Sequence, residues 1–278
     1  MNYVISDQNV SIPCMLYGTA WKKEHTADLV AQALQSGFRG IDTACQPKHY
    51  EEALVGEGCE RFYQNGGKRE ELFIQTKFTP REGQDPFRIP YDPHASLGEQ
   101  IIASCEASKQ NLRTNYLDSF LLHSPLFPYV NLLKAWSVFE SLYDEGKVHQ
   151  IGISNCYDLS LLQKFYDNAR IKPSVVQNRF YADVHYDKTL REWAKEKGVI
   201  YQSFWTLSAN PHILHSPIIR DMIDIYRKSA EQIFYRYVIQ KGIIPLNGTT
   251  SAQHMKEDLT IFEFSLEAKD VERIDALL

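Results

Sequence analysis

Short apolar runs alternate with segments of helical hydrophobic spacing along almost the whole chain. Each run is rich in branched aliphatic and aromatic residues, which is typical of a buried strand. No low-complexity linker separates the runs. We expect strands at residues 14–19, 38–43, 72–78, 119–123, 150–155, 174–178, 199–204 and 243–247.

Between these runs the spacing of the apolar residues predicts helices. The first helix is expected to begin with Thr26 as its N-cap and to stop at Gly37. Further helices are expected at residues 51–63, in a segment that ends near 111, and at 132–145, 159–168, 188–197 and 218–241, followed by two short helices.

Strands that alternate with helices form a parallel sheet, and about eight such units suggest a closed barrel. We therefore expect an α/β fold, a (β/α)8 TIM barrel in a single domain over residues 1–278. The alternative, an open doubly wound sheet, normally carries a glycine-rich phosphate-binding turn after its first strand. Here the first strand ends in Gly18-Thr19-Ala20-Trp21, and the partial glycine match at residues 56–61 does not follow a strand.

The composition restricts the partners of the chain. A net charge of −5 provides no basic surface, so we expect neither nucleic acid nor an acidic membrane as a partner. No apolar run is long enough to span a membrane, and the N-terminus lacks the pattern of a signal peptide. The five cysteines have no C-x-x-C spacing, which favours a reduced cytoplasmic protein without disulfides or a metal site. No heptad repeat or interface stripe indicates an oligomeric state.

Polar or functionally capable residues recur where the predicted strands end. In a barrel these ends share one rim, where catalytic groups gather. Taken singly, a carboxylate there is commonly a turn or helix cap, and a lysine is commonly a solvated charge on an apolar stem. Their occurrence together on one rim favours a site. In chain order the residues are Thr19, Asp42, Lys77, His123, Ser154, Asn155, Gln177, Phe204 and Asn247.

Three of these residues, Asp42, Lys77 and His123, suit carbonyl chemistry together with Tyr50. A tyrosine with an ordinary pKa of about 10 is a proton donor near neutrality, and a nearby ammonium group lowers that pKa. Asp42 would keep Lys77 charged, and His123 could orient a carbonyl group. No side chain supplies hydride, so a nicotinamide cofactor is required. Ser154, Asn155 and Gln177 match a carboxamide, and Phe204 offers a flat face for stacking.

The chain resembles an aldo-keto reductase over nearly its whole length. The motifs that carry the resemblance are GFRGIDTA (37–44), ELFIQTKF (71–78), YLDSFLLHSP (116–125), IGISN (151–155), VVQNRF (175–180) and VIQKGIIPLNGTTS (238–251). The resemblance implies an eight-stranded α/β barrel and NAD(P)H-dependent reduction of a small-molecule carbonyl. It assigns the catalytic roles to Asp42, Tyr50, Lys77 and His123.

The resemblance also implies the binding residues. The cofactor would contact Gly18, Thr19, Ala20, Asp42, Ser154, Asn155, Gln177, Phe204, Leu207, Asn247, Thr249, Thr250, Ser251, His254 and Asp258. The substrate pocket would be walled by Trp21, His49, Phe78, Phe127 and Trp205. The chain stops at Leu278, so the C-terminal loop that shapes the pocket in many relatives is short or missing, and we expect an open pocket.

Two departures from the family pattern concern the acid and the cofactor. The tyrosine usually lies five residues after the aspartate, where this chain has Pro47, so His49 competes with Tyr50 for the acid position. We favour Tyr50, because a histidine titrates near pH 6.5 and would behave differently. Leu246 stands where the family usually has a lysine for the 2′-phosphate of NADP. We prefer NADP(H), with NAD(H) as the alternative, because the start of a helix at Thr250 and Ser251 is a natural anion site.

Two other functions are compatible with these residues. A nucleotide-binding sensor or regulatory subunit with little turnover would explain the altered loop between Asp42 and Tyr50. A Schiff-base aldolase would use Lys77, which would then have to be uncharged rather than paired with Asp42.

Overall fold

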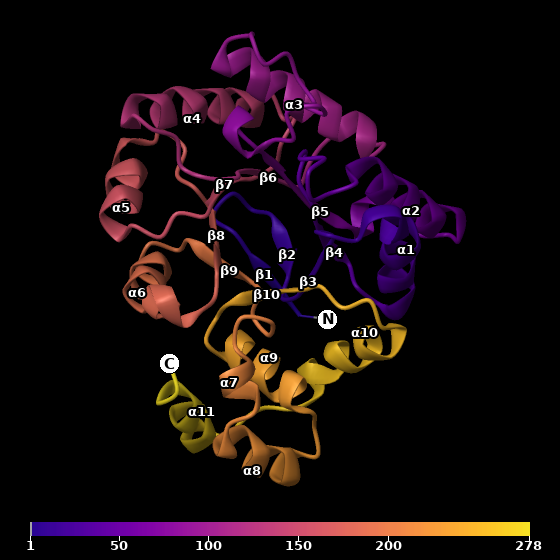
Figure 1. Cartoon of the computed structure of the whole chain (residues 1–278), viewed down its shortest axis with the longest axis vertical. Helices are drawn as coiled ribbons and strands as arrows, with labels where there is room; N and C mark the ends of the chain where they lie inside the picture. The colour runs from indigo at the N-terminus through magenta and orange to yellow at the C-terminus, as the bar shows by residue number, and fades with distance from the viewer. Residues whose placement is uncertain (1) are drawn as a thin grey trace.

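Eight parallel strands close into a barrel in the computed structural model, which describes residues 2–278. Around the barrel each strand pairs with the next in chain order, and β10 closes the ring by pairing with β9 and β3. The predicted TIM barrel is confirmed (Figure 1). The strands are β3 (Leu16–Gly18), β4 (Gly40–Asp42), β5 (Phe73–Phe78), β6 (Ser119–Leu122), β7 (Ile151–Ser154), β8 (Val175–Arg179), β9 (Ile200–Phe204) and β10 (Ile244–Asn247).

Helices surround the strands and cover their outer faces, as Figure 1 shows. None of the helices in the described part of the chain is long and apolar enough to cross a membrane. The helices are α1 (Thr26–Ser36), α2 (Glu52–Gln64), α3 (Leu97–Asn111), α4 (Tyr129–Asp144), α5 (Leu159–Asn168), α6 (Lys188–Glu196), α7 (Pro211–Leu214), α8 (Pro217–Tyr226), α9 (Ala230–Gln240), α10 (Ala252–Leu259) and α11 (Ala268–Asp275).

The largest apolar core lies between the outer faces of the strands and the helices. On one side of the barrel, Phe139 of α4 stacks on Phe120 of β6 and on Trp136, with ring centroids 4.7 and 5.6 Å apart. Burial of such rings is the main stabilising contribution of the helical layer, at about 25 cal/mol for each Å² of apolar surface.

A two-stranded antiparallel hairpin, β1 (Tyr3–Ile5) and β2 (Ser11–Pro13), precedes the barrel and was not predicted. Ile12 of the hairpin is fully buried, and it packs with inward-facing strand residues such as Leu16, Phe73 and Val175 in a second apolar cluster. The hairpin therefore closes the N-terminal end of the barrel. Strands of three residues are too short to show a periodic pattern, which is why the sequence did not reveal them.

Two helix boundaries differ from the expectation. Thr26 is the first residue of α1 rather than its N-cap, because a short turn at Lys23–His25 precedes it. The helix expected at residues 218–241 is two helices, α8 and α9, because Arg227 adopts a left-handed conformation (φ 54°) and Ser229 begins α9 with a capping box. The predicted stop at Gly37 is confirmed by its φ of 116°.

The packing of α2 against α3 depends on Gly56. A Cβ atom at this position would lie 2.0 Å from the carbonyl oxygen of Asn111, which is closer than any real contact. The glycine therefore allows the two helix backbones to approach, and α2 is the helix that follows the loop with His49 and Tyr50.

Candidate active site

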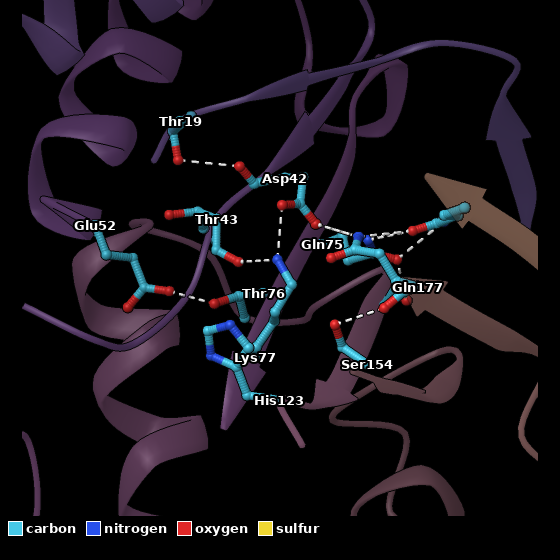
Figure 2. Close-up of polar contacts among 12 residues, drawn as sticks. Thr19, Asp42, Thr43, Glu52, Gln75, Thr76, Lys77, His123, Ser154 and Gln177 are labelled. Atoms are coloured by element: carbon cyan, nitrogen blue, oxygen red, sulfur yellow. Dashed lines mark hydrogen bonds and ion pairs between the residues drawn. The ribbon is translucent and has the colours of Figure 1, made fainter. Parts of the chain in front are cut away.

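The polar residues at the strand ends meet at the C-terminal rim of the barrel, around a buried ion pair (Figure 2). Lys77 Nζ donates to Asp42 Oδ2 at 2.6 Å and to the main-chain oxygen of Thr43 at 2.8 Å. The side chains of Asp42 and Lys77 are 2% and 1% exposed. Burial lowers the pKa of Lys77, and the carboxylate of Asp42 opposes that shift. The lysine is thus held by a partner of opposite charge.

The second oxygen of Asp42 is held by a layer of amides inside the barrel. Asp42 Oδ1 accepts from Gln75 Nε2 at 2.8 Å and from Gln177 Nε2 at 2.9 Å. Both amides also donate to Gln202 Oε1, at 2.7 and 2.9 Å. The three glutamines are buried, so this network fixes the carboxylate from below.

Sequence reasoning missed Gln75 and Gln202, although the signal was present. In a strand alternate residues share a face, so Gln75 lies on the same face as Lys77. A glutamine in an otherwise apolar strand needs a partner when it is buried. The polar layer beneath Asp42 could therefore have been inferred from FIQTKF and IYQSF.

Tyr50 lies close to the ion pair. Lys77 Nζ is 5.7 Å from the centre of the Tyr50 ring, and the ring of His123 is 6.2 Å away in an edge-on arrangement. The ring of His49 instead lies against Trp21, with centroids 3.8 Å apart and the ring planes tilted by 35°. The main-chain oxygen of His49 accepts from the main-chain N–H of Trp21 at 2.7 Å. This arrangement favours Tyr50 over His49 as the residue beside Lys77.

The electrostatic environment of Tyr50 differs from the expectation. Its pKa is raised, first by burial and second by the Asp42 carboxylate. Burial outweighs the lowering that was expected from Lys77, whose ammonium group is paired with Asp42 at 2.6 Å. A raised pKa keeps the phenol protonated at neutral pH, so the side chain has a proton that it can donate.

His123 follows β6 directly and is neutral near pH 7. Burial lowers its pKa to about 3, and the nearby charges of Lys77 and His49 act in the same direction. Its Nδ1 atom lies 2.6 Å from Thr79 Oγ1, and its main-chain oxygen accepts from Asn155 Nδ2 at 2.8 Å. The ring is therefore held at one nitrogen, which leaves Nε2 for another partner.

The predicted carboxamide-binding residues adjoin each other at the end of β7 and on β8. Ser154 Oγ donates to the main-chain oxygen of Gln177 at 2.7 Å, and Asn155 Nδ2 also reaches Ser154 Oγ at 3.3 Å. The amide N–H groups of Gln177 are engaged by Asp42 and Gln202. Within residues 2–278 no side chain or main chain donates to Gln177 Oε1. This oxygen can therefore accept from an N–H group, so the three side chains fit the carboxamide of a nicotinamide.

An arginine that was not among the expected site residues stands at the end of β8. Arg179 and Gln177 leave the strand on the same face, because alternate residues do so. The guanidinium group of Arg179 stacks on Trp205 at 4.0 Å, and its Nε atom is buried without a hydrogen-bond partner among residues 2–278. An unpaired guanidinium group at this rim fits a phosphate of a dinucleotide.

The loop between β10 and α10 is organised by its own side chains. Asn247 Nδ2 donates to Asp258 Oδ2 at 2.6 Å, and both residues are buried. Burial raises the pKa of Asp258 to about 6. Thr249 Oγ1 accepts from the Ser251 N–H, and Ser251 caps α10. Of the predicted cofactor-binding residues in this region, Thr250 and His254 are exposed.

The remaining predicted site residues are partly buried in the barrel and partly exposed at its rim. Thr19 is buried and donates to the main-chain oxygen of Asp42 at 3.0 Å. Phe78, expected in the wall of the substrate pocket, is fully buried against Tyr91, with ring centroids 5.6 Å apart. Three aromatic residues expected in the pocket are exposed: Trp21, Phe127 and Trp205. Gly18, Ala20, Phe204 and Leu207 are half-buried.

Comparison with known proteins gives one consistent result. The model of the Aldo/keto reductase family matches residues 14–209. "Uncharacterized oxidoreductase YtbE" of Bacillus subtilis (strain 168) is 33% identical over 250 residues, which cover 89% of this chain and 82% of that protein. "Glyoxal reductase" of the same organism is 29% identical with the same coverage. The crystal structure of an aldo/keto reductase from Brucella melitensis superposes with a TM-score of 0.85 at 24% identity, covering 100% of this chain and 99% of that one.

Proposed function

The chain belongs to the aldo/keto reductase family, a family of oxidoreductases that act on carbonyl compounds, and from this premise we propose that it reduces aldehydes or ketones to alcohols. Tyr50 is the proton donor, and Lys77, Asp42 and His123 assist it. The whole chain acts as one barrel domain on a small-molecule substrate. The observation that carries the proposal is the buried Lys77–Asp42 pair at 2.6 Å, with Tyr50 and His123 beside it.

The residues of the chain handle the proton and the orientation of the substrate. Tyr50 donates its phenolic proton to the carbonyl oxygen, since its raised pKa keeps it protonated until a charge develops on that oxygen. Lys77 stabilises the phenolate that remains. A neutral His123 whose Nδ1 accepts from Thr79 carries its proton on Nε2, where it can donate to the same carbonyl oxygen. A nicotinamide cofactor, when bound, would supply the hydride, which no side chain can provide.

NADP(H) is the preferred cofactor in this proposal, and NAD(H) is possible. Thr250 and His254 are exposed near the first turn of α10, where free main-chain N–H groups favour an anion. Lys22 adds a positive charge to this region, because its ammonium group donates to the main-chain oxygen of Gly248. The family uses nicotinamide cofactors, so the choice concerns only the 2′-phosphate.

The pairing of Lys77 bears on the aldolase alternative. A Schiff-base lysine has to be uncharged in order to attack a carbonyl carbon. The carboxylate of Asp42 at 2.6 Å stabilises the charged form of Lys77 instead. The structure therefore supports a reductase over an aldolase.

The test follows cofactor oxidation spectroscopically with a panel of aldehydes for the wild type, Tyr50→Phe and His49→Ala. We expect Tyr50→Phe to lose about 100- to 10,000-fold in turnover, the usual contribution of a general acid, and to keep its affinity for the cofactor. Intact turnover in Tyr50→Phe together with its loss in His49→Ala would show that the histidine is the acid. Tight cofactor binding without turnover of any carbonyl would favour the sensor function.

A further inference from the structure

Glu52, the first residue of α2, is a buried carboxylate with three hydrogen-bonded hydroxyl and amide partners. Its Oε1 atom accepts from Thr76 Oγ1 at 2.5 Å and from Ser108 Oγ at 3.0 Å, and its Oε2 atom accepts from Asn111 Nδ2 at 3.0 Å. Glu52 as a whole is 5% exposed. A carboxylate in the first turn of a helix usually faces solvent and needs no such set of donors.

Two of these partners lie on α3, and the third lies on β5 next to Lys77. Because side chains alternate along a strand, Thr76 points out of the barrel while Lys77 points into it. Glu52 therefore contacts the strand from behind the ion pair, as Figure 2 shows for Glu52 and Thr76. The carboxylate joins the start of α2 to the strand that carries Lys77.

The other end of the same loop is attached to the same strand. Cys45 begins the loop, and its main-chain N–H donates to the Lys77 oxygen at 3.1 Å. Burial and then the nearby carboxylate of Glu52 raise the pKa of the Cys45 thiol, so the two ends of the loop lie close together. Residues 46–51, which include His49 and Tyr50, are thus a loop closed at both ends against β5.

We infer that Glu52 is a positioning residue, which holds the loop of residues 46–51 so that Tyr50 stands over Lys77. It touches neither of them, and it acts through the backbone of Tyr50, two residues earlier in the chain, and of Thr76, the neighbour of Lys77. The inference rests on the proposed role of Tyr50 as the acid. It also explains how a loop that departs from the family pattern still places a tyrosine 5.7 Å from Lys77 Nζ.

The experiment compares Glu52→Ala with a matched control, Glu140→Ala. Glu140 of α4 is also a largely buried helix carboxylate, and it accepts from the Ile171 N–H at 2.9 Å, far along the chain from the site. We expect Glu52→Ala to lower kcat about 10- to 100-fold, as a displacement of about 1 Å does, with little change in KM or in the cofactor Kd. Glu140→Ala should lower the melting temperature and leave kcat unchanged.

A double-mutant cycle with Tyr50→Phe decides whether Glu52 acts through the tyrosine. In the Tyr50→Phe background, Glu52→Ala should not lower kcat further, so the double variant should have the kcat of Tyr50→Phe. Losses that multiply would overturn the inference, and so would wild-type kcat in Glu52→Ala. Wild-type kcat in Tyr50→Phe would refute the proposed acid itself, which is a different outcome.

Two milder variants answer the question if Glu52→Ala does not fold. Glu52→Gln retains an acceptor for Thr76, and Thr76→Val removes that single hydrogen bond at nearly constant volume. Both should lower kcat by less than Glu52→Ala, and both losses should vanish in the Tyr50→Phe background. A loss of kcat that persists in that background would contradict the positioning role.

Discussion

Replacement of His123 by asparagine should change how the stability of the protein depends on pH. The pKa of His123 is about 3 in the folded protein and near 6.5 in an unfolded chain. Between these values the unfolded state binds a proton that the folded state does not, so stability falls as the pH is lowered. Above pH 6.5 the contribution of His123 is fully present, and below it is progressively lost.

The magnitude follows from the same two values. At pH 4.5 an unfolded histidine is about two pH units below its pKa, while the folded residue is still neutral. At about 1.4 kcal/mol for each unit, His123 alone lowers the free energy of unfolding by roughly 2–3 kcal/mol between pH 7 and pH 4.5. The variant His123→Asn should lack this part of the acid sensitivity, whatever its stability at pH 7.

Urea denaturation at pH 7 and at pH 4.5, followed by tryptophan fluorescence, gives the change in the free energy of unfolding between the two pH values. This change is then compared between His123→Asn and the wild type. His25 lies exposed at the surface, so His25→Asn is the matched control and should keep the pH dependence of the wild type. Equal losses of stability in His123→Asn and in the wild type would show that His123 is not held neutral by burial. The same result would weaken its assignment as a neutral hydrogen-bond donor.

Three further changes should have distinct effects. Lys77→Met leaves the carboxylate of Asp42 buried without its ion-pair partner, which should cost about 3–5 kcal/mol in urea denaturation and most of the turnover. Gly56→Ala forces a Cβ atom against the Asn111 oxygen and should lower the free energy of unfolding by at least about 1–3 kcal/mol, measured by thermal melting. Arg179→Met should weaken NADH and NADPH about 10- to 100-fold alike in fluorescence titrations, since both share the diphosphate; a loss confined to NADPH would contradict this.

The barrel and the location of its rim could be predicted because both depend on local pattern. Asp42 and Lys77 stand at or near the ends of apolar strands, and the ends of parallel strands meet at one rim. The break between α8 and α9 was also readable in principle, because Ser229 and Gln232 form a capping box. The regular helical spacing on both sides concealed it.

What the sequence did not reveal depends on contacts between distant segments. Glu52 looks like an ordinary first-turn carboxylate until its partners on α3 are known. The pKa of Tyr50 was expected to fall, but the Lys77 charge is paired with Asp42 and burial dominates instead. Phe78 ends a strand as the site residues do, yet it is buried against Tyr91.

The hairpin at the N-terminal end of the barrel places residues that stabilise the fold away from residues that would bind the substrate. Its apolar floor, formed around Ile12 and Phe73, shares no hydrogen bond with the polar layer at Gln75 and Gln202 within the described residues. Mutations that raise thermal tolerance can therefore accumulate in the floor, while the loops of the opposite rim diversify toward new substrates. In laboratory evolution the floor is the region to randomise first for robustness, so that later libraries at the rim tolerate more destabilising change.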